Sequence, residues 1–289
     1  MSELLLRTAP ARQATPSVRP QVAAAAPPVV RRASLGRRAL HATGQVLLRT
    51  TAVVAFLALW EIAPRVGLVD RVFLPPLSEV LQATGDLIAS GALAEHVSSS
   101  LTRAGAGFGL AIVTAIPVGL LIGWYRPVSL ALTPILEAFR NTAALALLPV
   151  FVLILGIGET SKIALVLFAT FFPILLNTIS GVRTVDPLLI KSAQSLGLSP
   201  LRLFQKVILP AAVPTIFTGL RMAGAASILV LVAAEMIGAQ AGLGYLISAA
   251  QLNFQIPQMY AGILTISVIG IVVNYVLLTL ERRFSRWRA

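Results

Sequence analysis

The chain has 289 residues, of which 57% are hydrophobic and 12% are charged, and its formal net charge is +12. Soluble domains carry about 25% charged residues, so this composition excludes an ordinary soluble domain and indicates an integral membrane protein. The lack of cysteine excludes disulfides, thiolate metal sites and cysteine nucleophiles. The positive charge does not indicate nucleic-acid binding, because Lys and Arg flank apolar segments.

Arginine, alanine and proline dominate the first 44 residues, which contain one acid, Glu3. Such a segment cannot bury enough apolar surface to offset the entropy that is lost on ordering. It also lacks the apolar core and the cleavage site of a secretory signal peptide. We therefore predict a disordered cytoplasmic leader over residues 1–44 and a transmembrane domain over residues 45–289.

Six later segments are long and apolar enough to cross a membrane, which takes about 20 residues. They are residues 46–63, 104–124, 128–156, 160–182, 213–237 and 259–280. The sequence thus predicts an all-α fold, a polytopic bundle of six transmembrane helices. The third segment is longer than a bilayer requires, and we expect it to tilt, bend or break near Pro134, residues 140–142 or Pro149. Small residues over 103–119 and 221–230 predict close helix contacts.

Residues 75–97, between the first two spans, show helical spacing of apolar side chains with acids between them. The apolar positions are Leu77, Val80, Leu81, Leu87 and Ile88. This pattern predicts an amphipathic helix that lies at the membrane surface.

Lys and Arg are concentrated in the leader, in residues 183–206 and in the C-terminal sequence ERRFSRWRA. Segments rich in these residues stay on the cytoplasmic side of a membrane. We therefore predict that both termini and residues 183–212 are cytoplasmic. The same topology places Arg103 and Lys162 in outer segments.

The sequence shows no nucleotide-hydrolysing or catalytic motif. GIGETSK, residues 156–162, differs from a phosphate-binding loop because Ser161 stands where the motif needs glycine. His41 and His96 are too far apart in sequence to indicate a local metal pair. We expect a transport subunit and not an enzyme, driven by another chain or by an ion gradient.

Residues 186–210 carry two helix starts in close succession. Asp186-Pro187 begins one helix, which Gly197 ends, and Ser199-Pro200 begins a second that runs to Leu209-Pro210. Two short helices joined by a fixed elbow could dock into a partner, and an ordinary helical loop is the alternative on this pattern alone.

This segment resembles the EAA loop of ABC importer permeases, which reads EAA, three residues, Gly, nine residues and Ile-x-Leu-Pro. Lys191-Ser192-Ala193 stands at EAA, Gly197 at the glycine and Val207–Pro210 at the end, with Lys191, Ser192 and Val207 as departures. Longer stretches such as LLPVFVLILGIGETSKI and AAEMIGAQAGLGYLI are similar to the nitrate, sulfonate, taurine and bicarbonate branch. The likeness covers about residues 50–285.

The resemblance implies a type I ABC importer permease in a bacterial cytoplasmic (inner) membrane. Its partners would be a second copy, two cytoplasmic ATPase subunits that bind ATP and Mg²⁺, and an outer solute-binding protein. It also assigns ATPase coupling to Lys191, Ser192, Ala193, Gly197, Leu209 and Pro210. The solute would be a small anion such as a sulfonate, taurine, nitrate or bicarbonate, although the branch also has members for neutral and aromatic solutes. The alternative, a self-sufficient secondary transporter, would usually show inverted repeats, and none is visible.

Polar side chains within the predicted spans are candidates for the translocation path, because they are costly in a bilayer and usually face the bundle interior. They are Glu137, Arg140, Asn141, Asn177 and Glu235. Glu137 and Arg140 share a helical face and could pair with each other instead. The other three could be interhelical hydrogen-bond partners.

Overall fold

The computed structural model describes residues 35–284, and the side chains of residues 50–284. It divides into two units, residues 1–54 and residues 55–289. The described part of the first unit belongs to helix α1 (Leu35–Arg65), which begins ten positions before the predicted transmembrane domain. The rest of the predicted leader lies outside the described residues.

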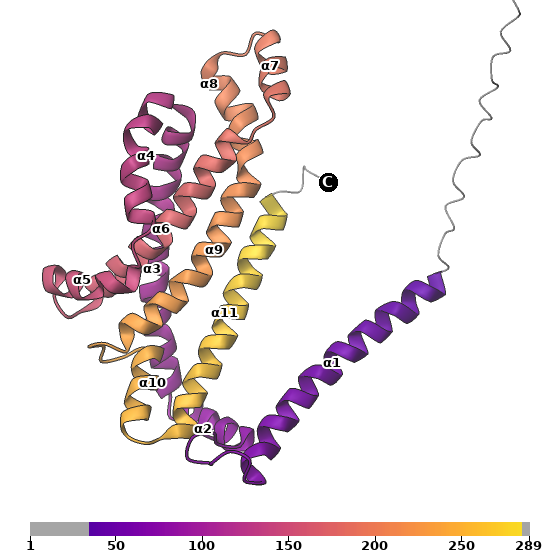
Figure 1. Ribbon diagram of the computed structural model, residues 1–289, viewed down its shortest axis with the longest axis vertical. Helices are drawn as coiled ribbons and strands as arrows, with labels where there is room; N and C mark the ends of the chain where they lie inside the picture. The colour runs from indigo at the N-terminus through magenta and orange to yellow at the C-terminus, as the bar shows by residue number, and fades with distance from the viewer. Residues whose placement is uncertain (1–34, 285–289) are drawn as a thin grey trace, which may run out of the picture. The chain divides into compact units, whose positions relative to one another are not determined.

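The second unit is helical, with no strand among its described residues. After α1 the elements are α2 (Leu77–Ala89), α3 (Ala92–Trp124), α4 (Arg126–Arg140), η1 (Ala144–Leu147), α5 (Leu148–Leu155), α6 (Glu159–Arg183), α7 (Pro187–Ser195), α8 (Pro200–Leu203), η2 (Phe204–Ile208), α9 (Leu209–Glu235), α10 (Leu243–Leu252) and α11 (Ile256–Phe284). The long helices α3, α6, α9 and α11 form a bundle, with α7 and α8 at one end and α2 and α10 at the other (Figure 1).

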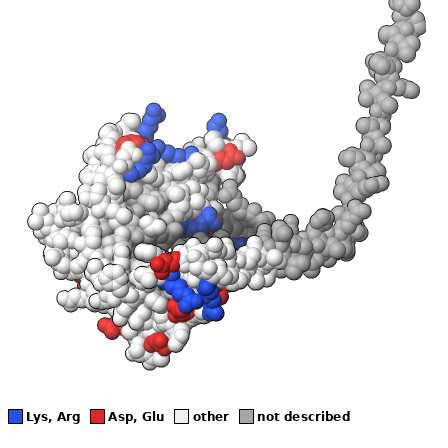
Figure 2. All heavy atoms as spheres, turned by 60° about the horizontal axis from the view of Figure 1, so that its bottom comes forward, with Lys and Arg blue, Asp and Glu red and all other residues white. Residues whose placement is uncertain are grey.

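Among the described residues, four helices are long and apolar enough to cross a membrane, or five if the bent pair of α4 with η1 and α5 counts as one span. The predicted span 46–63 lies in α1, whose side chains are described only from residue 50, so the count of six stays a prediction. On the face in Figure 2, charged side chains gather in a few small groups and other residues form most of the described surface. A surface with so few charged side chains is compatible with contact with lipid acyl chains.

Helix α6 forms the centre of the bundle, with α3 packed on one side and α9 on another. Small residues allow this close approach, as predicted. A Cβ atom at Gly107 of α3 would lie 2.7 Å from Cβ of Val166, and one at Gly119 would lie 2.7 Å from Cβ of Thr178. Both partners are on α6, so larger side chains at either glycine would separate the two helices.

The third predicted span is broken. Helix α4 and the following η1–α5 pair meet at 85°. The break falls at residues 141–143, whereas Pro134 lies within α4 and Pro149 lies in the first turn of α5. Of the three positions at which the sequence predicts a bend or break, only the polar segment at residues 140–142 interrupts the helix.

Two predicted helix boundaries are wrong. The amphipathic helix over 75–97 is in fact two helices, because α2 ends at Ala89 and Gly91 turns the chain with φ of +76° into α3. The helix after Ser199-Pro200 does not end at Leu209-Pro210, since α8, η2 and α9 form one continuous helix from Pro200 to Glu235. Pro210 lies in the first turn of α9, directly after the π-helical segment η2, whose wider turn accommodates a residue without an N–H.

Candidate functional site

The first candidate region is the elbow, residues 186–204, at one end of the bundle (Figure 1). Oδ1 of Asp186 accepts a hydrogen bond from the N–H of Leu188 at 2.8 Å, which caps α7 as predicted. Gly197 has φ of +74°, and the N–H of Leu198 donates to the carbonyl of Ala193 at 3.2 Å. A left-handed residue at this place turns the chain between the two helices, which confirms the predicted elbow geometry.

The elbow buries one side and exposes another. Ala193 and Leu203 are buried against the bundle, whereas Lys191 and Ser192 are exposed. Large apolar side chains on the outer side are also exposed: Leu188, Leu189, Leu196 and Leu201. Clustered exposed leucines of this kind mark an interaction surface. The predicted coupling residues Leu209 and Pro210 are half-buried in α9 and do not belong to this exposed side.

A second region is a cavity of about 400 Å³ beside the break in the third span. It contains Arg140 and Asn177 among apolar walls formed by Phe139, Ala144, Phe168, Ala169, Phe172, Pro173, Leu176, Met222, Ala226 and Val230, with Thr142 as a further polar residue. The rings of Phe168 and Phe172 are 5.4 Å apart in an edge-to-face arrangement. The structure therefore brings two of the five path candidates to one cavity with aromatic walls.

Glu137 and Asn141 do not line this cavity, and the hydrogen bonds of the asparagines are local. Glu137 pairs with Arg140 at 3.1 Å between Oε2 and Nη2, and these side chains are 52% and 47% exposed. Asn141 donates its side-chain N–H to the carbonyl of Glu137 at 2.9 Å, and Asn177 donates to the carbonyl of Pro173 at 2.8 Å. These two asparagines thus bond mainly within their own helices.

Glu235 belongs to a third region, a charge cluster where α6 begins and α9 ends. Its side chain is almost fully buried, and Oε1 lies 2.7 Å from Nη1 of Arg103 on α3. Arg103 also donates to Glu159 of α6, from Nη2 to Oε1 at 2.6 Å, and to the carbonyl of Ala241 at 2.6 Å. Ser100 donates to Glu235 at 2.8 Å. Three helices therefore meet through one arginine.

The first turn of α10 and the loop before it close this charge cluster through their backbone. The N–H of Gly244 donates to Oε2 of Glu235 at 3.0 Å, and the N–H of Leu243 donates to Oγ of Ser100 at 2.8 Å. Gly242 has φ of +120°, and a Cβ atom there would lie 2.4 Å from the carboxylate carbon of Glu235. The buried Lys162 donates to the carbonyls of Gly158 and Gly238. Most charges and polar atoms of the cluster thus have partners.

Sequence reasoning did not find the charge cluster. It used Arg103 and Lys162 as flanking charges of outer segments, a side that stays a prediction, and it did not predict that both are buried within helices, α3 and α6. The reason for Arg103 is that α3 already starts at Ala92, so Ser100 and Arg103 lie on a helix face that is buried in the bundle, whereas Glu95 and Ser98 nearer its start are exposed. A signal was present in the spacing of Ser100 and Arg103 on one helical face and in the glycines after Glu235.

Comparison with known proteins gives consistent matches. The family model described as "Binding-protein-dependent transport system inner membrane component" matches residues 115–287. The taurine transport system permease protein TauC of Escherichia coli is 36% identical over 84% of this chain and 90% of its own length. A putative aliphatic sulfonates transport permease protein, SsuC of Bacillus subtilis, is 35% identical over 80% of this chain and 84% of its own.

The fold has a solved counterpart. An inward-facing structure of the MetNI methionine ABC transporter aligns with a TM-score of 0.57 over 65% of this chain and 94% of the matched chain, at 19% identity. At this identity the likeness concerns the fold alone.

Proposed function

Because this chain belongs to the family of binding-protein-dependent transport system inner membrane components, it is the permease of an ABC importer, and we propose that it carries a small anion. A sulfonate or taurine is the class favoured by the names of the relatives TauC and SsuC. Nitrate and bicarbonate are further candidates that rest on the sequence resemblance alone. Membership of this family removes the alternative of a self-sufficient secondary transporter.

The cavity beside the broken span supports an anionic solute. Arg140 supplies a positive charge to an otherwise apolar and aromatic space, and Asn177 adds an amide. A guanidinium binds the oxygens of a sulfonate or carboxylate with two parallel hydrogen bonds. Glu137 reduces the local positive potential in this state, so solute binding would compete with the Glu137–Arg140 pair.

The observation that carries the coupling proposal is the continuous helix from Pro200 to Glu235. At about 1.5 Å per residue, such a helix is about 54 Å long. It begins in the elbow and ends in the charge cluster, so a displacement of the elbow would move both the cavity wall at Met222 and the buried Glu235. We place the ATPase subunits on the exposed leucines of α7 and the turn after it, Leu188, Leu189 and Leu196.

We propose the remaining partners and the orientation on the basis of the same arrangement. The elbow end would face the cytoplasm, together with both termini, and the solute-binding protein would dock at the opposite end near α2 and α10. A second copy would complete the path along the cavity face, because one bundle leaves Arg140 and Glu137 about half exposed. ATP and Mg²⁺ would bind the ATPase subunits and not this chain. The protein would reside in a bacterial inner membrane.

Membrane orientation can be tested directly because the chain contains no cysteine. Ser195→Cys in the elbow and Asn253→Cys after α10 each introduce one exposed thiol. In spheroplasts, a membrane-impermeant maleimide should label Asn253→Cys at once and Ser195→Cys only after permeabilisation. The reverse order would overturn the orientation.

Transport is tested with the tagged chain purified from its own host. We expect a co-purifying ATPase, and proteoliposomes that take up labelled taurine or an alkanesulfonate only with ATP and the cognate binding protein. Uptake driven by an ion gradient without ATP would contradict the proposal. ATP-dependent uptake of a neutral solute alone would agree with the importer assignment but would contradict the proposal that the solute is an anion.

A further inference from the structure

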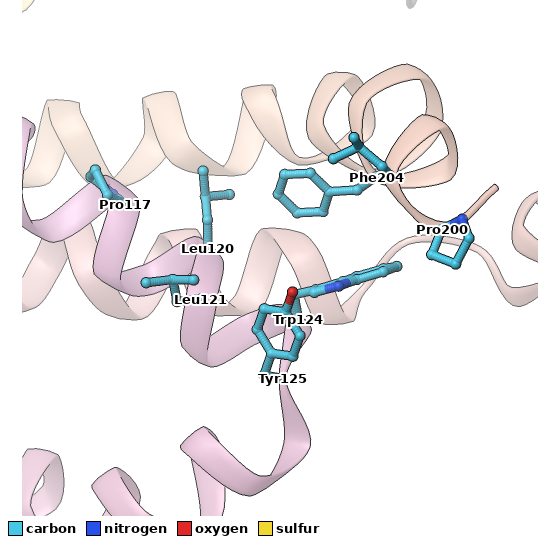
Figure 3. A pocket seen from close by; sticks show the side chains of 8 residues that line it. Pro117, Leu120, Leu121, Trp124, Tyr125, Pro200 and Phe204 are labelled. Carbon is cyan, nitrogen blue, oxygen red and sulfur yellow. The ribbon is translucent and has the colours of Figure 1, made fainter.

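Two cavities of opposite character share the ring of Trp124 at the elbow end of the bundle. The first measures about 580 Å³ and is apolar, with walls from Pro117, Leu120, Leu121, Trp124, Tyr125, Pro200, Leu201 and Phe204 (Figure 3). The rings of Trp124 and Phe204 meet edge to face at 5.3 Å between centroids. This contact joins the end of α3 to the start of the long helix and forms the inner wall of the cavity.

The second cavity measures about 410 Å³ and is lined by Ile122, Gly123, Trp124, Arg126, Ser129, Leu130 and Arg183. Its two cations come from the start of α4 and the end of α6. The guanidinium of Arg183 donates to Oγ of Ser129. Within residues 50–284, neither Arg126 nor Arg183 forms an ion pair with an acid. The pair therefore presents uncompensated positive charge beside an apolar cavity.

We propose that the two cavities together hold one phospholipid with an anionic headgroup, taken from the leaflet at the elbow end. The phosphate would lie between Arg126 and Arg183, and an acyl chain would occupy the apolar cavity on the other side of Trp124. The position supports this assignment, because the transmembrane helix α3 ends at Trp124 and tryptophan and tyrosine are enriched at membrane interfaces. Basic pockets between transmembrane helices at this level bind lipid headgroups.

Other occupants fit the two cavities less well. A free phosphate ion would satisfy the arginines but would leave the apolar cavity without a ligand. The chain's own N-terminal segment is rich in arginine and would be repelled by Arg126 and Arg183. An apolar segment of a partner protein would fill the first cavity only. A lipid supplies both an anion and a long apolar chain in one molecule.

The inference uses only the membrane assignment of the bundle. It depends on neither the solute, the ATPase nor the orientation, because vesicles with the same lipids in both leaflets present the ligand to either end. Failure of the lipid proposal would therefore leave the importer assignment unchanged, and the reverse also holds.

Quenching of Trp124 fluorescence tests the proposal in the full chain. Trp60→Phe and Trp287→Phe leave Trp124 as the single tryptophan. The protein is reconstituted in phosphatidylcholine vesicles with 10 mol % of either brominated phosphatidylglycerol or brominated phosphatidylcholine. We expect the brominated anionic lipid to quench Trp124 at least threefold more strongly, and 10 mM inorganic phosphate to leave this difference unchanged.

Substitutions identify the groups that create the preference. Arg126→Gln with Arg183→Gln should reduce quenching by phosphatidylglycerol to the level of phosphatidylcholine. Arg202→Gln is the matched control, since Arg202 lies at the same end on α8 but lines neither cavity, and it should keep the preference. Leu121→Asn, at a half-exposed position of the apolar wall, should lower quenching by both lipids.

Several outcomes would overturn the proposal. Equal quenching by the two lipids, or a preference that survives the double substitution, removes the headgroup site. Loss of the preference in phosphate shows a simple anion site. Unchanged quenching in Leu121→Asn removes the acyl-chain site. If the double variant does not reconstitute, single Arg183→Gln, at an exposed position, gives the same comparison, and no reduction there would equally reject the site.

Discussion

Arg103 on α3 and Glu235 on α9 are separated by 132 positions in the sequence, yet their side chains form an ion pair of 2.7 Å in which both are almost completely buried. Burying two charges carries a large desolvation penalty, which mutual attraction offsets only with good geometry and further hydrogen bonds. Ser100 and the N–H of Gly244 supply such bonds to Glu235. The pair therefore specifies how α3 and α9 pack where α9 ends.

Removing one partner of this pair should be strongly destabilising. Arg103→Met leaves the carboxylate of Glu235 buried without its counter-charge, and we expect a loss of about 3–5 kcal/mol in the free energy of unfolding. This loss is measured by denaturant unfolding in detergent micelles, with circular dichroism as the readout. Arg140→Met is the control, because an exposed pair contributes only about 0–1 kcal/mol. Arg103→Met with Glu235→Met should recover much of the loss, and a double variant as unstable as the single one would refute the charge argument.

The loop glycine against Glu235 should not tolerate a methyl group. Gly242→Ala places a Cβ atom 2.4 Å from the carboxylate carbon of Glu235 and must displace it. Gly67→Ala is the matched control, because Gly67 also has positive φ but has open space at the Cβ position. A positive φ also strains an alanine at both positions, by about 1–3 kcal/mol, and this strain is greater at Gly242, whose φ of +120° with ψ of 165° is normally adopted by glycine alone. We expect Gly242→Ala to lower the thermal unfolding temperature more than Gly67→Ala, and equal shifts would contradict this.

The elbow should require its left-handed residue for coupling and not for membrane insertion. Gly197→Val disfavours φ of +74° by about 1–2 kcal/mol or more, since the side chain is β-branched. We expect normal amounts of protein in the membrane together with at least a tenfold loss of ATP-driven uptake. Gly270→Val on α11, where a Cβ meets nothing within 4 Å, should retain uptake. Normal uptake by a well-expressed Gly197→Val complex would remove the coupling role of the elbow.

Arg140 should influence solute passage more than stability. Because its pair with Glu137 is half exposed, Arg140→Gln should change stability by less than about 1 kcal/mol. We expect it to reduce anion uptake at least fivefold while basal ATP hydrolysis and complex yield stay near wild type. Glu137→Gln removes the competing carboxylate and should maintain or increase uptake. A collapse in yield with normal transport by the surviving complex would identify Arg140 as a structural partner only.

The sequence was informative where local chemistry decides the structure. The cap at Asp186, the turn at Gly197 and the break after Arg140 all depend on residues within a few positions of one another. Each could be predicted from conformational preferences of the individual residue types. Four of the apolar spans, or five with the bent pair, were predictable from the sequence in the same way, because the length and hydropathy of a helix are properties of one segment.

The charge cluster was not predictable in the same way. Arg103, Glu159 and Glu235 come together only after three helices have packed, and nothing within one segment indicates which charges will meet. A positive charge near the end of a span can also be a flanking charge that only reflects membrane topology, and this is how Arg103 and Lys162 are interpreted from the sequence. The prediction that the helix ends at Pro210 was wrong for a related reason. Proline normally disfavours helix continuation, and the wider turn of η2 allows the helix to continue through Pro210.

The π-helical segment η2 determines where the chain between elbow and bundle can lose a residue. A π turn contains about one residue more than an α turn. Deleting one residue from Phe204–Ile208 would convert this turn to a regular α turn and would change the relative rotation of the flanking helical segments little. Deleting one residue from the regular part of α9 has no such compensation and would rotate Leu188 and Leu196 about 100° around the helix axis. A surface that must meet a partner on one side would then face away from it. We therefore expect a one-residue deletion to be better tolerated within η2 than in the regular helix that follows it.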